Sequence, residues 1–321
     1  ETWKGYVNAI GYNIIKKIEL KIGGTTIDKI DSQWLDIYNE LYNQKSDCLV
    51  GKFNSDLSLQ ENSSAQRVYI PLPFWFTKNP GLAFPICALT HHEMQLIVKF
   101  RSLNEIVKSN ISNLSVSPIT LMGDLIVNYI QLDNDEEIKF KKMDHEYLIE
   151  QLNIETHSIT NTTTNTFVNL DRKHPIKELI WIILDNINHT QNIKTGNNWL
   201  SYTSNTCNFL DTFKTASISL EGNKLIEEMY SDYYRNITPY EVYNYIPRKH
   251  IYSYSFSLTP TNNVQPSGAC NFSNLTTKKI EFNFETNSNK SGSPCNGNIK
   301  IYLVNYNIIT IKNGIFSQLY S

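Results

Sequence analysis

Hydrophobic and polar residues alternate over several short stretches of this chain. In "IELKI", residues 18–22, the two isoleucines and the leucine fall on one side, and the glutamate and lysine fall on the other. The same period of two recurs at residues 94–100, 252–258 and 280–284. Successive side chains of a β-strand point to opposite faces, so this pattern predicts strands with one buried face. We therefore expect an antiparallel, all-β protein.

Two stretches depart from this alternation and predict helices. Over residues 31–43 apolar residues recur at helical spacing, and Asp31 or Ser32 is placed to cap the first turn. A second, weaker helix is predicted over residues 224–236, "KLIEEMYSDYYRN". Three polar stretches are too poor in apolar residues to enter a core and are expected to be surface loops: 43–66, 101–118 and 186–211.

Four blocks of sequence recur in one order, which indicates an internal repeat. "KKIELKIGGTTI" aligns with "TASISLEGNKLI", with Gly24 opposite Gly222 at an offset of 198 (222 minus 24), and a predicted helix follows each block. The later blocks match as follows: 70–76 with 252–258 (offset 182), 96–100 with 280–284 (offset 184), and 126–130 with 303–307 (offset 177). The length changes fall in loops, so the repeat predicts two copies of one antiparallel domain.

The repeat also predicts where the two domains divide. They are expected to join near residues 144–147, which gives a first domain at 1–144 and a second at 145–321. In the second copy, 75 residues (148–222) lead up to and include Gly222, and they contain two strand-like runs. In the first copy, only 24 residues lead up to and include the matching Gly24. The first domain is therefore expected to lack about two N-terminal strands, either because the chain is a fragment, which we favour, or because those strands come from elsewhere.

Residues 68–100, "VYIPLPFWFTKNPGLAFPICALTHHEMQLIVKF", are apolar enough to raise the question of a membrane segment. A membrane helix needs about 20 apolar residues without breakers. Four prolines interrupt this stretch and would break a helix: Pro71, Pro73, Pro80 and Pro85. The stretch is instead predicted to form two strands, "YIPLPFWF" and "HEMQLIVKF", around a tight connection at "KNPGLAFP".

His91, His92 and Glu93 are the first candidates for a metal site. Metal-binding strands of the cupin type space their ligands as His-x-His with a carboxylate, because alternate residues point to one side of a strand. Adjacent histidines point to opposite faces, so these two are predicted to be hydrogen-bonded and not metal-bound. His145 and His174 are interpreted in the same way, which leaves a cupin-like metalloenzyme as the third of three hypotheses.

No known catalytic motif stands out in the sequence. We find no Gly-x-Ser-x-Gly, no phosphate-binding loop and no cysteine beside a base. A lone carboxylate such as Asp124 is interpreted as solvated. The sequence therefore predicts no catalytic, cofactor-binding or metal-binding residues, no cofactor and no enzymatic activity.

Charge and cysteine content narrow the possible partners and compartments. With 29 basic and 31 acidic residues the net charge is −2, which provides no general attraction to nucleic acid or to an anionic membrane. The opening "ETWKGYVNAIGY" has no targeting pattern. The cysteines lack metal-ligand or redox spacing, which favours a reducing compartment: Cys48, Cys87, Cys207, Cys270 and Cys295.

Aromatic residues are abundant, with 19 Tyr, 14 Phe and 5 Trp. Exposed aromatic rings are typical of sugar-binding sites, so a carbohydrate-binding jelly-roll module is the second hypothesis. Most of these rings lie at core positions of predicted strands and helices, where packing explains them. The others are expected at protein interfaces, where tyrosine and tryptophan are enriched.

Several motifs, taken in order, resemble the major capsid proteins of the nucleocytoplasmic large DNA viruses. They are "IELKIGGTTIDKIDSQW", the stretch at 68–100, "HEYLIEQLNIE", "QPSGACNFSNLTTKKIEF" and the closing "IYLVNYNIITIKNG". The resemblance covers essentially the whole chain. At the front the family has a further N-terminal segment, at the place where the repeat also shows a gap.

The resemblance implies a double jelly roll, with two antiparallel eight-stranded β-sandwiches in tandem and short helices in loops. It also implies a homotrimer, a pseudo-hexagonal capsomer that packs against neighbouring capsomers in an icosahedral shell around an internal membrane. Minor capsid and penton proteins are the other implied partners, without direct contact to nucleic acid and with only indirect contact to the membrane. Assembly is expected in the host cytoplasm, and a minor capsid protein of the same fold is an alternative.

Overall fold

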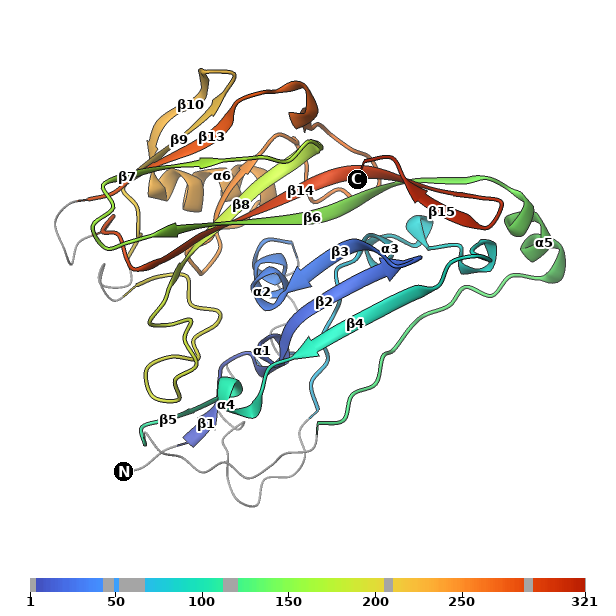
Figure 1. Ribbon diagram of the computed structural model, residues 1–321, viewed down its shortest axis with the longest axis horizontal. Helices are drawn as coiled ribbons and strands as arrows, with labels where there is room; N and C mark the ends of the chain where they lie inside the picture. The colour runs from blue at the N-terminus through green and yellow to red at the C-terminus, as the bar shows by residue number, and fades with distance from the viewer. Residues whose placement is uncertain are drawn as a thin grey trace.

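The computed structural model of the 321-residue chain describes residues 4–42, 49–51, 67–111, 121–204, 210–285 and 291–320. Cys48, Cys207 and parts of the three predicted loops lie outside these residues. We call residues 1–144 the first half and residues 145–321 the second half. Figure 1 shows the two halves side by side, with helix α5 (Asn134–Lys142) at one end of the molecule, where the chain passes from one half to the other.

The second half is a sandwich of two antiparallel sheets. One sheet has the strand order β10-β9-β13-β7, and the other has β11-β8-β14-β15, with β6 beside β14 and β12 beside β8. The strands are β6 (His145–Ile159), β7 (Asn165–Asn169), β8 (Pro175–Asp185), β9 (Thr215–Leu220), β10 (Asn223–Tyr230), β11 (Tyr252–Ser255), β12 (Cys270–Asn271), β13 (Lys278–Asn283), β14 (Gly297–Lys312) and β15 (Ile315–Gln318). The short helices described with them are η4 (Tyr233–Ile237), α6 (Thr238–Tyr243) and η5 (Phe272–Asn274).

Strands β8 and β14 are buried on both faces. Ile301 and Leu303 of β14 pack into the core between the two sheets, whereas Tyr302 and Val304 belong to a second core that is shared with the first half. Strand β8 reads "PIKELIWIILD", which is apolar on both sides over most of its length. A strand with two buried faces loses the polar alternation of a surface strand. The sheet of β8 and β14 is therefore the wall between the two halves.

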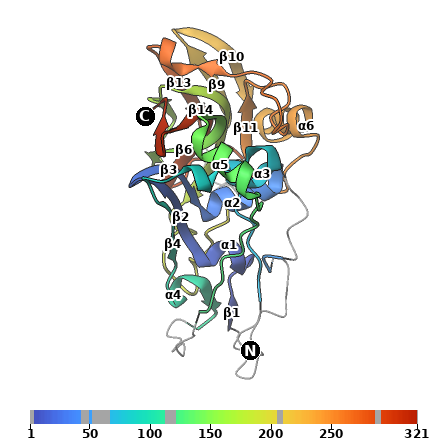
Figure 2. The same cartoon turned by 90° about the vertical axis from the view of Figure 1, so that its right-hand side faces the viewer.

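The first half contains a three-stranded sheet of order β3-β2-β4 and a small β1-β5 pair. Its strands are β1 (Lys4–Tyr6), β2 (Ile15–Ile22), β3 (Thr25–Asp31), β4 (Met94–Phe100) and β5 (Val107–Ser109). Its helices, besides α5, are α1 (Ile10–Ile14), α2 (Ser32–Leu41), α3 (Trp75–Lys78), η1 (Pro80–Leu82), η2 (Ile86–Ala88) and α4 (Leu103–Ile106). Figure 2 shows α2 between this sheet and the second half.

The internal repeat is visible in the sheet topology. Strand β2 lies between β3 and β4, as β9 lies between β10 and β13. These three pairs of strands are the ones that the sequence blocks align. In the first half the pairing places Leu20 opposite Leu96, and in the second it places Ile218 opposite Ile280.

Three secondary-structure predictions are wrong. The stretches 101–118 and 186–211 are not surface loops throughout: the first contains α4 and β5 with the buried Val107, and the second contributes the buried Tyr202 to the shared core. Residues 223–230 form strand β10 and not the first part of a helix, because pairing with β9 overrides their helical propensity; helical structure begins only at Ser231. The stretch "YIPLPFWF" is not a strand: residues 67–74 have no regular structure and α3 follows. Its prolines lack the N–H groups that a strand ladder needs. The predicted strand at 94–100 and the helix over 31–43, with Asp31 as its cap, are confirmed.

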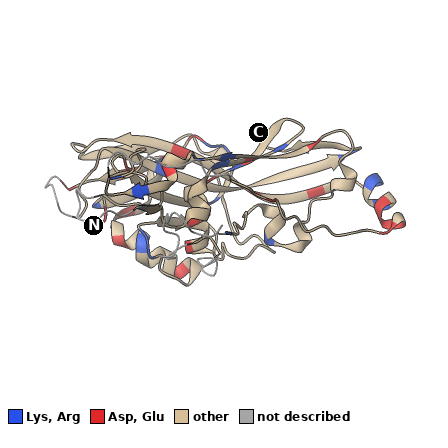
Figure 3. Ribbon diagram, turned by 90° about the horizontal axis from the view of Figure 1, so that it is seen from below, with Lys and Arg blue, Asp and Glu red and all other residues tan. Residues whose placement is uncertain are grey.

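Residues 121–133, which include "IVNYI", have no regular secondary structure, although their counterpart in the repeat lies in β14. Many apolar side chains of this segment are exposed: Leu121, Met122, Leu125, Ile126, Val127, Tyr129 and Ile130. The segment leads into α5, which projects from the end of the molecule and carries acidic residues in its first turn and basic residues in its last (Figure 3). Among the described helices, none combines the length and hydropathy needed to cross a membrane.

Candidate functional site at the interface of the two halves

The two halves share one hydrophobic core. It joins side chains of β2, β3 and α2 to side chains of β6, β8 and β14, among them Ile37 and Ile180, which have no exposed surface. The rings of Trp34 and Tyr302 lie 5.4 Å apart across this boundary. Because such a core resembles the interior of one domain, it opposes rotation of one half against the other.

Helix α2 places acidic side chains in this apolar boundary. Asp31 caps the helix by accepting a hydrogen bond from the Trp34 backbone N–H at 2.8 Å. Asp36 and Glu40 are four residues apart, so they lie on one face of the helix. Asp36 has no exposed surface and Glu40 is 1% exposed. Buried carboxylates of this kind must be paired.

Each carboxylate of α2 is paired with a cation of the second half. The ammonium group of Lys249 lies 2.6 Å from Oδ2 of Asp36, which also accepts a hydrogen bond from the Tyr202 hydroxyl at 2.7 Å. The guanidinium of Arg248 donates to Oε1 of Glu40 at 3.0 Å. These contacts link α2 to the segment that precedes β11.

The N-terminus of α2 is tied to β14. Lys300 forms an ion pair with Asp31, and the Tyr302 hydroxyl donates to the same carboxylate at 3.2 Å. In addition, the Gln33 side-chain amide donates to the carbonyl oxygen of Trp199 at 3.1 Å. The two ends of α2 are thus held by different elements of the second half, which fixes both its position and its direction.

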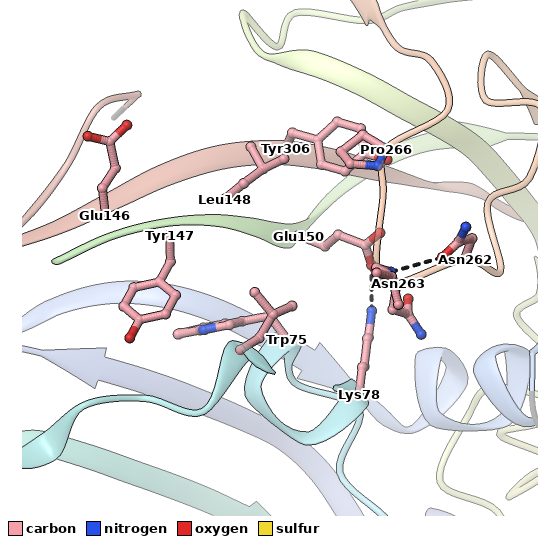
Figure 4. A pocket seen from close by; sticks show the side chains of 12 residues that line it. Trp75, Lys78, Glu146, Tyr147, Leu148, Glu150, Asn262, Asn263, Pro266 and Tyr306 are labelled. Carbon is pink, nitrogen blue, oxygen red and sulfur yellow. Dashed lines mark hydrogen bonds and ion pairs between the residues drawn. The ribbon is translucent and has the colours of Figure 1, made fainter. Parts of the chain in front are cut away.

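A second charged cluster surrounds Glu150 of β6. The ammonium group of Lys78 from the first half contacts its carboxylate (Figure 4), and so does that of Lys177 from β8. Burial alone would raise the pKa of Glu150, but the two lysines outweigh that effect and lower it to about 2. Burial would lower the pKa of Lys177, but the neighbouring Glu178 and Glu150 outweigh that effect and raise the pKa above its ordinary value. Glu150 and Lys177 are therefore both charged at neutral pH.

Glu178 joins this cluster to two tyrosines, one from each half. The Tyr42 hydroxyl, at the end of α2, donates to its Oε1 at 2.6 Å, and the Tyr243 hydroxyl of α6 donates to its Oε2. Burial, together with the charge of Glu178, raises the pKa of both tyrosines well above the ordinary value. The tyrosines therefore remain protonated donors.

Asp28 of β3 is an interface carboxylate that accepts hydrogen bonds from the backbone. Its Oδ1 accepts hydrogen bonds from the backbone N–H groups of Leu152, at 3.2 Å, and Lys29, at 2.8 Å. Burial raises its pKa from 3.8 to about 6. This group therefore changes charge near neutral pH.

A small pocket of about 180 Å³ opens beside the Glu150 cluster (Figure 4). Trp75, Tyr147 and Tyr306 contribute aromatic surface to it, and Lys78 and Glu150 contribute charge. These two charged groups are already paired with each other at 2.7 Å. This ion pair joins the two halves across the pocket.

The histidines that were weighed as metal-ligand candidates contact different parts of the chain. His92 accepts a hydrogen bond from the Phe316 backbone N–H at 3.2 Å, and the His91 backbone N–H donates to the Gly314 carbonyl at 3.1 Å. One ring nitrogen of His145 lies 2.7 Å from the Phe140 carbonyl. Within the described ranges, no group of three or more His, Cys, Asp or Glu side chains is arranged to hold a metal ion.

Sequence reasoning missed the interface carboxylates, although a signal was present. Asp36 and Glu40 lie on a helix that is rich in apolar residues. A carboxylate that is buried with such a helix needs a partner, so the two acidic residues indicate an ionic contact. The partners Lys249 and Arg248 follow more than 200 residues later, so no local pattern identifies them. A buried, fully paired ionic network contributes little net stability but specifies one arrangement of the groups around it.

The comparisons with known proteins agree with this architecture. The major capsid protein of Paramecium bursaria Chlorella virus 1 is 30% identical over 96% of this chain and 79% of its own length, and that of Pyramimonas orientalis virus is 27% identical over 99% and 79%. The quasi-atomic capsid model of the former virus superposes with a TM-score of 0.79 at 24% identity, covering 100% of this chain and 88% of that one. The predicted double jelly roll is confirmed by this likeness.

The family models divide the chain in two. Residues 1–133 match the major capsid protein N-terminus, and residues 136–317 match the large eukaryotic DNA virus major capsid protein. The second match alone covers more than half of the chain. On this basis the chain belongs to the family of major capsid proteins of large eukaryotic DNA viruses.

Proposed function

We propose that this capsid protein assembles into homotrimers, and that each trimer is a pseudo-hexagonal capsomer of an icosahedral shell. In this proposal residues 1–144 and 145–321 are the two jelly rolls of each subunit, so a trimer presents six similar lobes. Neighbouring capsomers and minor capsid and penton proteins are its other partners. The protein contacts no nucleic acid directly, contacts the internal membrane only indirectly, has no enzymatic activity and is assembled in the host cytoplasm.

The observation that carries the proposal is the interface between the halves. Two units that share the matching strand orders β3-β2-β4 and β10-β9-β13 are held at one relative position by a shared apolar core and by ion pairs at Asp31, Asp36 and Glu40. A rigid subunit with two similar lobes is what a threefold ring with a nearly sixfold outline requires. A flexible tether between the lobes would not define that outline.

The test is the mass of the purified chain in solution, measured by light scattering and by native mass spectrometry. The proposal expects a trimer, and negative-stain images of it should show six lobes around a threefold axis. A monomer or dimer over the whole accessible concentration range would contradict the proposal.

A further inference from the structure

A histidine lies directly beside the ion pairs that join the two halves. Residues 248–250 read Arg-Lys-His, and the first two pair with Glu40 and Asp36 of α2. His250 contacts the second half instead: its Nε2 lies 3.1 Å from Nη1 of Arg235 in η4. One short segment therefore holds α2 with two of its side chains and η4 with the third.

The contact with Arg235 fixes the protonation state of the His250 ring. A guanidinium group stays charged at neutral pH and can only donate hydrogen bonds. Nε2 of His250 must therefore accept from Nη1 of Arg235, which requires that this nitrogen carry no proton. The ring in this arrangement is the neutral imidazole, with its proton on Nδ1.

Arg235 and Asp211 are the charged groups that face the His250 ring within the described part of the chain. Oδ1 of Asp211, in the segment before β9, lies 3.3 Å from Nε of Arg235 and 3.9 Å from Nε2 of His250. The same oxygen accepts a hydrogen bond from the Tyr252 hydroxyl of β11 at 2.8 Å. The carboxylate oxygen nearest to the ring thus already serves two other groups.

A proton on Nε2 is incompatible with this arrangement. The nitrogen would face Arg235 as donor against donor and as one positive charge against another. Asp211 attracts the charged ring, but its Oδ1 is shared with Arg235 and Tyr252. Burial has the largest effect on the His250 ring, whose side chain is 16% exposed, and together with Arg235 it lowers the pKa below the ordinary value of 6.5. The folded chain therefore favours the neutral ring.

His250 is coupled to α2 through a tight turn of the backbone. The Ile251 N–H donates to the Lys249 carbonyl oxygen at 2.8 Å, which closes a three-residue turn with His250 at its centre. The Lys249 ammonium group lies 2.6 Å from Oδ2 of Asp36 and also donates to the Leu200 carbonyl oxygen at 3.2 Å. Because the turn joins the two residues directly, a shift of His250 displaces Lys249.

We propose that His250 is a pH switch in the interface between the two halves. At neutral pH its ring accepts from Arg235 and holds residues 248–250 in contact with α2. In mild acid Arg235 repels the protonated ring, and the ion pairs of residues 248 and 249 with α2 loosen. The stability that the neutral ring provides is complete above pH 6.5 and is lost as the pH falls below it, because the unfolded chain then binds the proton more tightly. The switch lies within one chain and does not depend on the proposed trimer.

Hydrogen exchange of α2 in the full chain, followed by mass spectrometry at about pH 7.5 and pH 5.5, tests the switch. After correction for the intrinsic exchange rate, residues 32–41 of the wild type should exchange several-fold faster at the lower pH, up to about tenfold, which is the most that one pH unit below 6.5 allows. His250→Gln keeps an acceptor for Arg235 that does not titrate, so the acceleration should disappear. Arg235→Met removes the repelling cation and should abolish it as well.

Two other histidines provide the controls. His91 is exposed in the first half, and His91→Gln should respond to acid like the wild type. His189 is the alternative source of an acid response, because its Nε2 lies 3.2 Å from the Trp199 carbonyl oxygen, which also accepts from Gln33 of α2. His189→Gln should retain the acceleration.

The switch is overturned if the wild type shows no acceleration, if His250→Gln retains it, or if His189→Gln alone removes it. A His250→Gln variant that exchanges faster already at pH 7.5 has a loosened α2 for another reason. In that case Arg235→Met decides, and an acceleration retained in that variant overturns the switch.

Discussion

The Lys249 ammonium group lies 2.6 Å from Oδ2 of Asp36, 213 positions away in the chain. The carboxylate has no exposed surface, and it belongs to the helix that packs against the other half. This pair, with those of Glu40 and Asp31, defines where α2 sits on the second half. The interface is therefore specified by matched charges as well as by apolar burial.

Removing the Asp36 carboxylate should destabilise the protein strongly. In Asp36→Ala, Lys249 and the Tyr202 hydroxyl lose their shared partner inside a largely dry interface. The free energy of unfolding should fall by about 3 kcal/mol, as is typical of breaking a buried pair. Urea titration at fixed protein concentration measures it. Glu137→Ala, which removes an exposed pair with Lys141, should cost about 0.5 kcal/mol or less; equal losses in the two variants would refute the assignment.

Asp28 should make the protein less stable as the pH rises. Its pKa is about 6 in the folded chain against 3.8 ordinarily, so the folded state holds the proton more tightly. Between pH 4 and 6 this group therefore lowers the free energy of unfolding, and the loss is complete above pH 6.

Asp28→Asn removes that loss, since an amide oxygen still accepts from Leu152 and Lys29. The variant should nearly match the wild type at pH 4 and exceed it by about 3 kcal/mol at pH 7. Urea midpoints across this range give the difference. A difference that is independent of pH would show that the charge of Asp28 is not its cause.

Glu150 should have the opposite pH dependence. Its pKa is lowered from 4.5 to about 2, so the stability it provides is present above pH 4.5 and is lost as the pH falls toward 2. Glu150→Gln should lower the free energy of unfolding at pH 7 by about 3 kcal/mol, because Lys177 is left with weaker compensation. The loss should shrink at pH 3. Glu146→Gln, an exposed position on the same strand, is the control and should change little at either pH.

A side chain at Gly314, in the turn between β14 and β15, should destabilise the protein. This residue has φ +77°, and a Cβ there would lie 1.8 Å from Oγ1 of Thr90 in the first half. Gly24 has a similar φ of +82° but open space around it. Gly24→Ala should cost about 1 kcal/mol of backbone strain, and Gly314→Ala should cost more, because strain and clash combine. Similar thermal unfolding midpoints for the two variants would show that the turn moves away freely.

Local sequence patterns predicted those parts of the fold that depend on neighbours along the chain. Alternation in "IELKI" predicted β2, and helical spacing with Asp31 as a cap predicted α2. Both signals come from residues that are only a few positions apart in the sequence. The same reasoning failed at β10. There "NKLIEEMY" has good helix formers, and only the ladder supplied by β9 makes it a strand.

The chain by itself thus determined an all-β protein built from two related units, since period-two alternation and the aligned blocks are properties of the sequence alone. Only the tertiary structure decided how the units meet. Lys249 with Asp36, Arg248 with Glu40, and Lys78 with Glu150 are separated by 72 to 213 positions, and each side chain, taken alone, resembles a solvated surface charge. At the shared interface these charges are buried and must be paired, so the pairs fix the orientation of the two halves. No local sequence pattern identifies the partner of each charge.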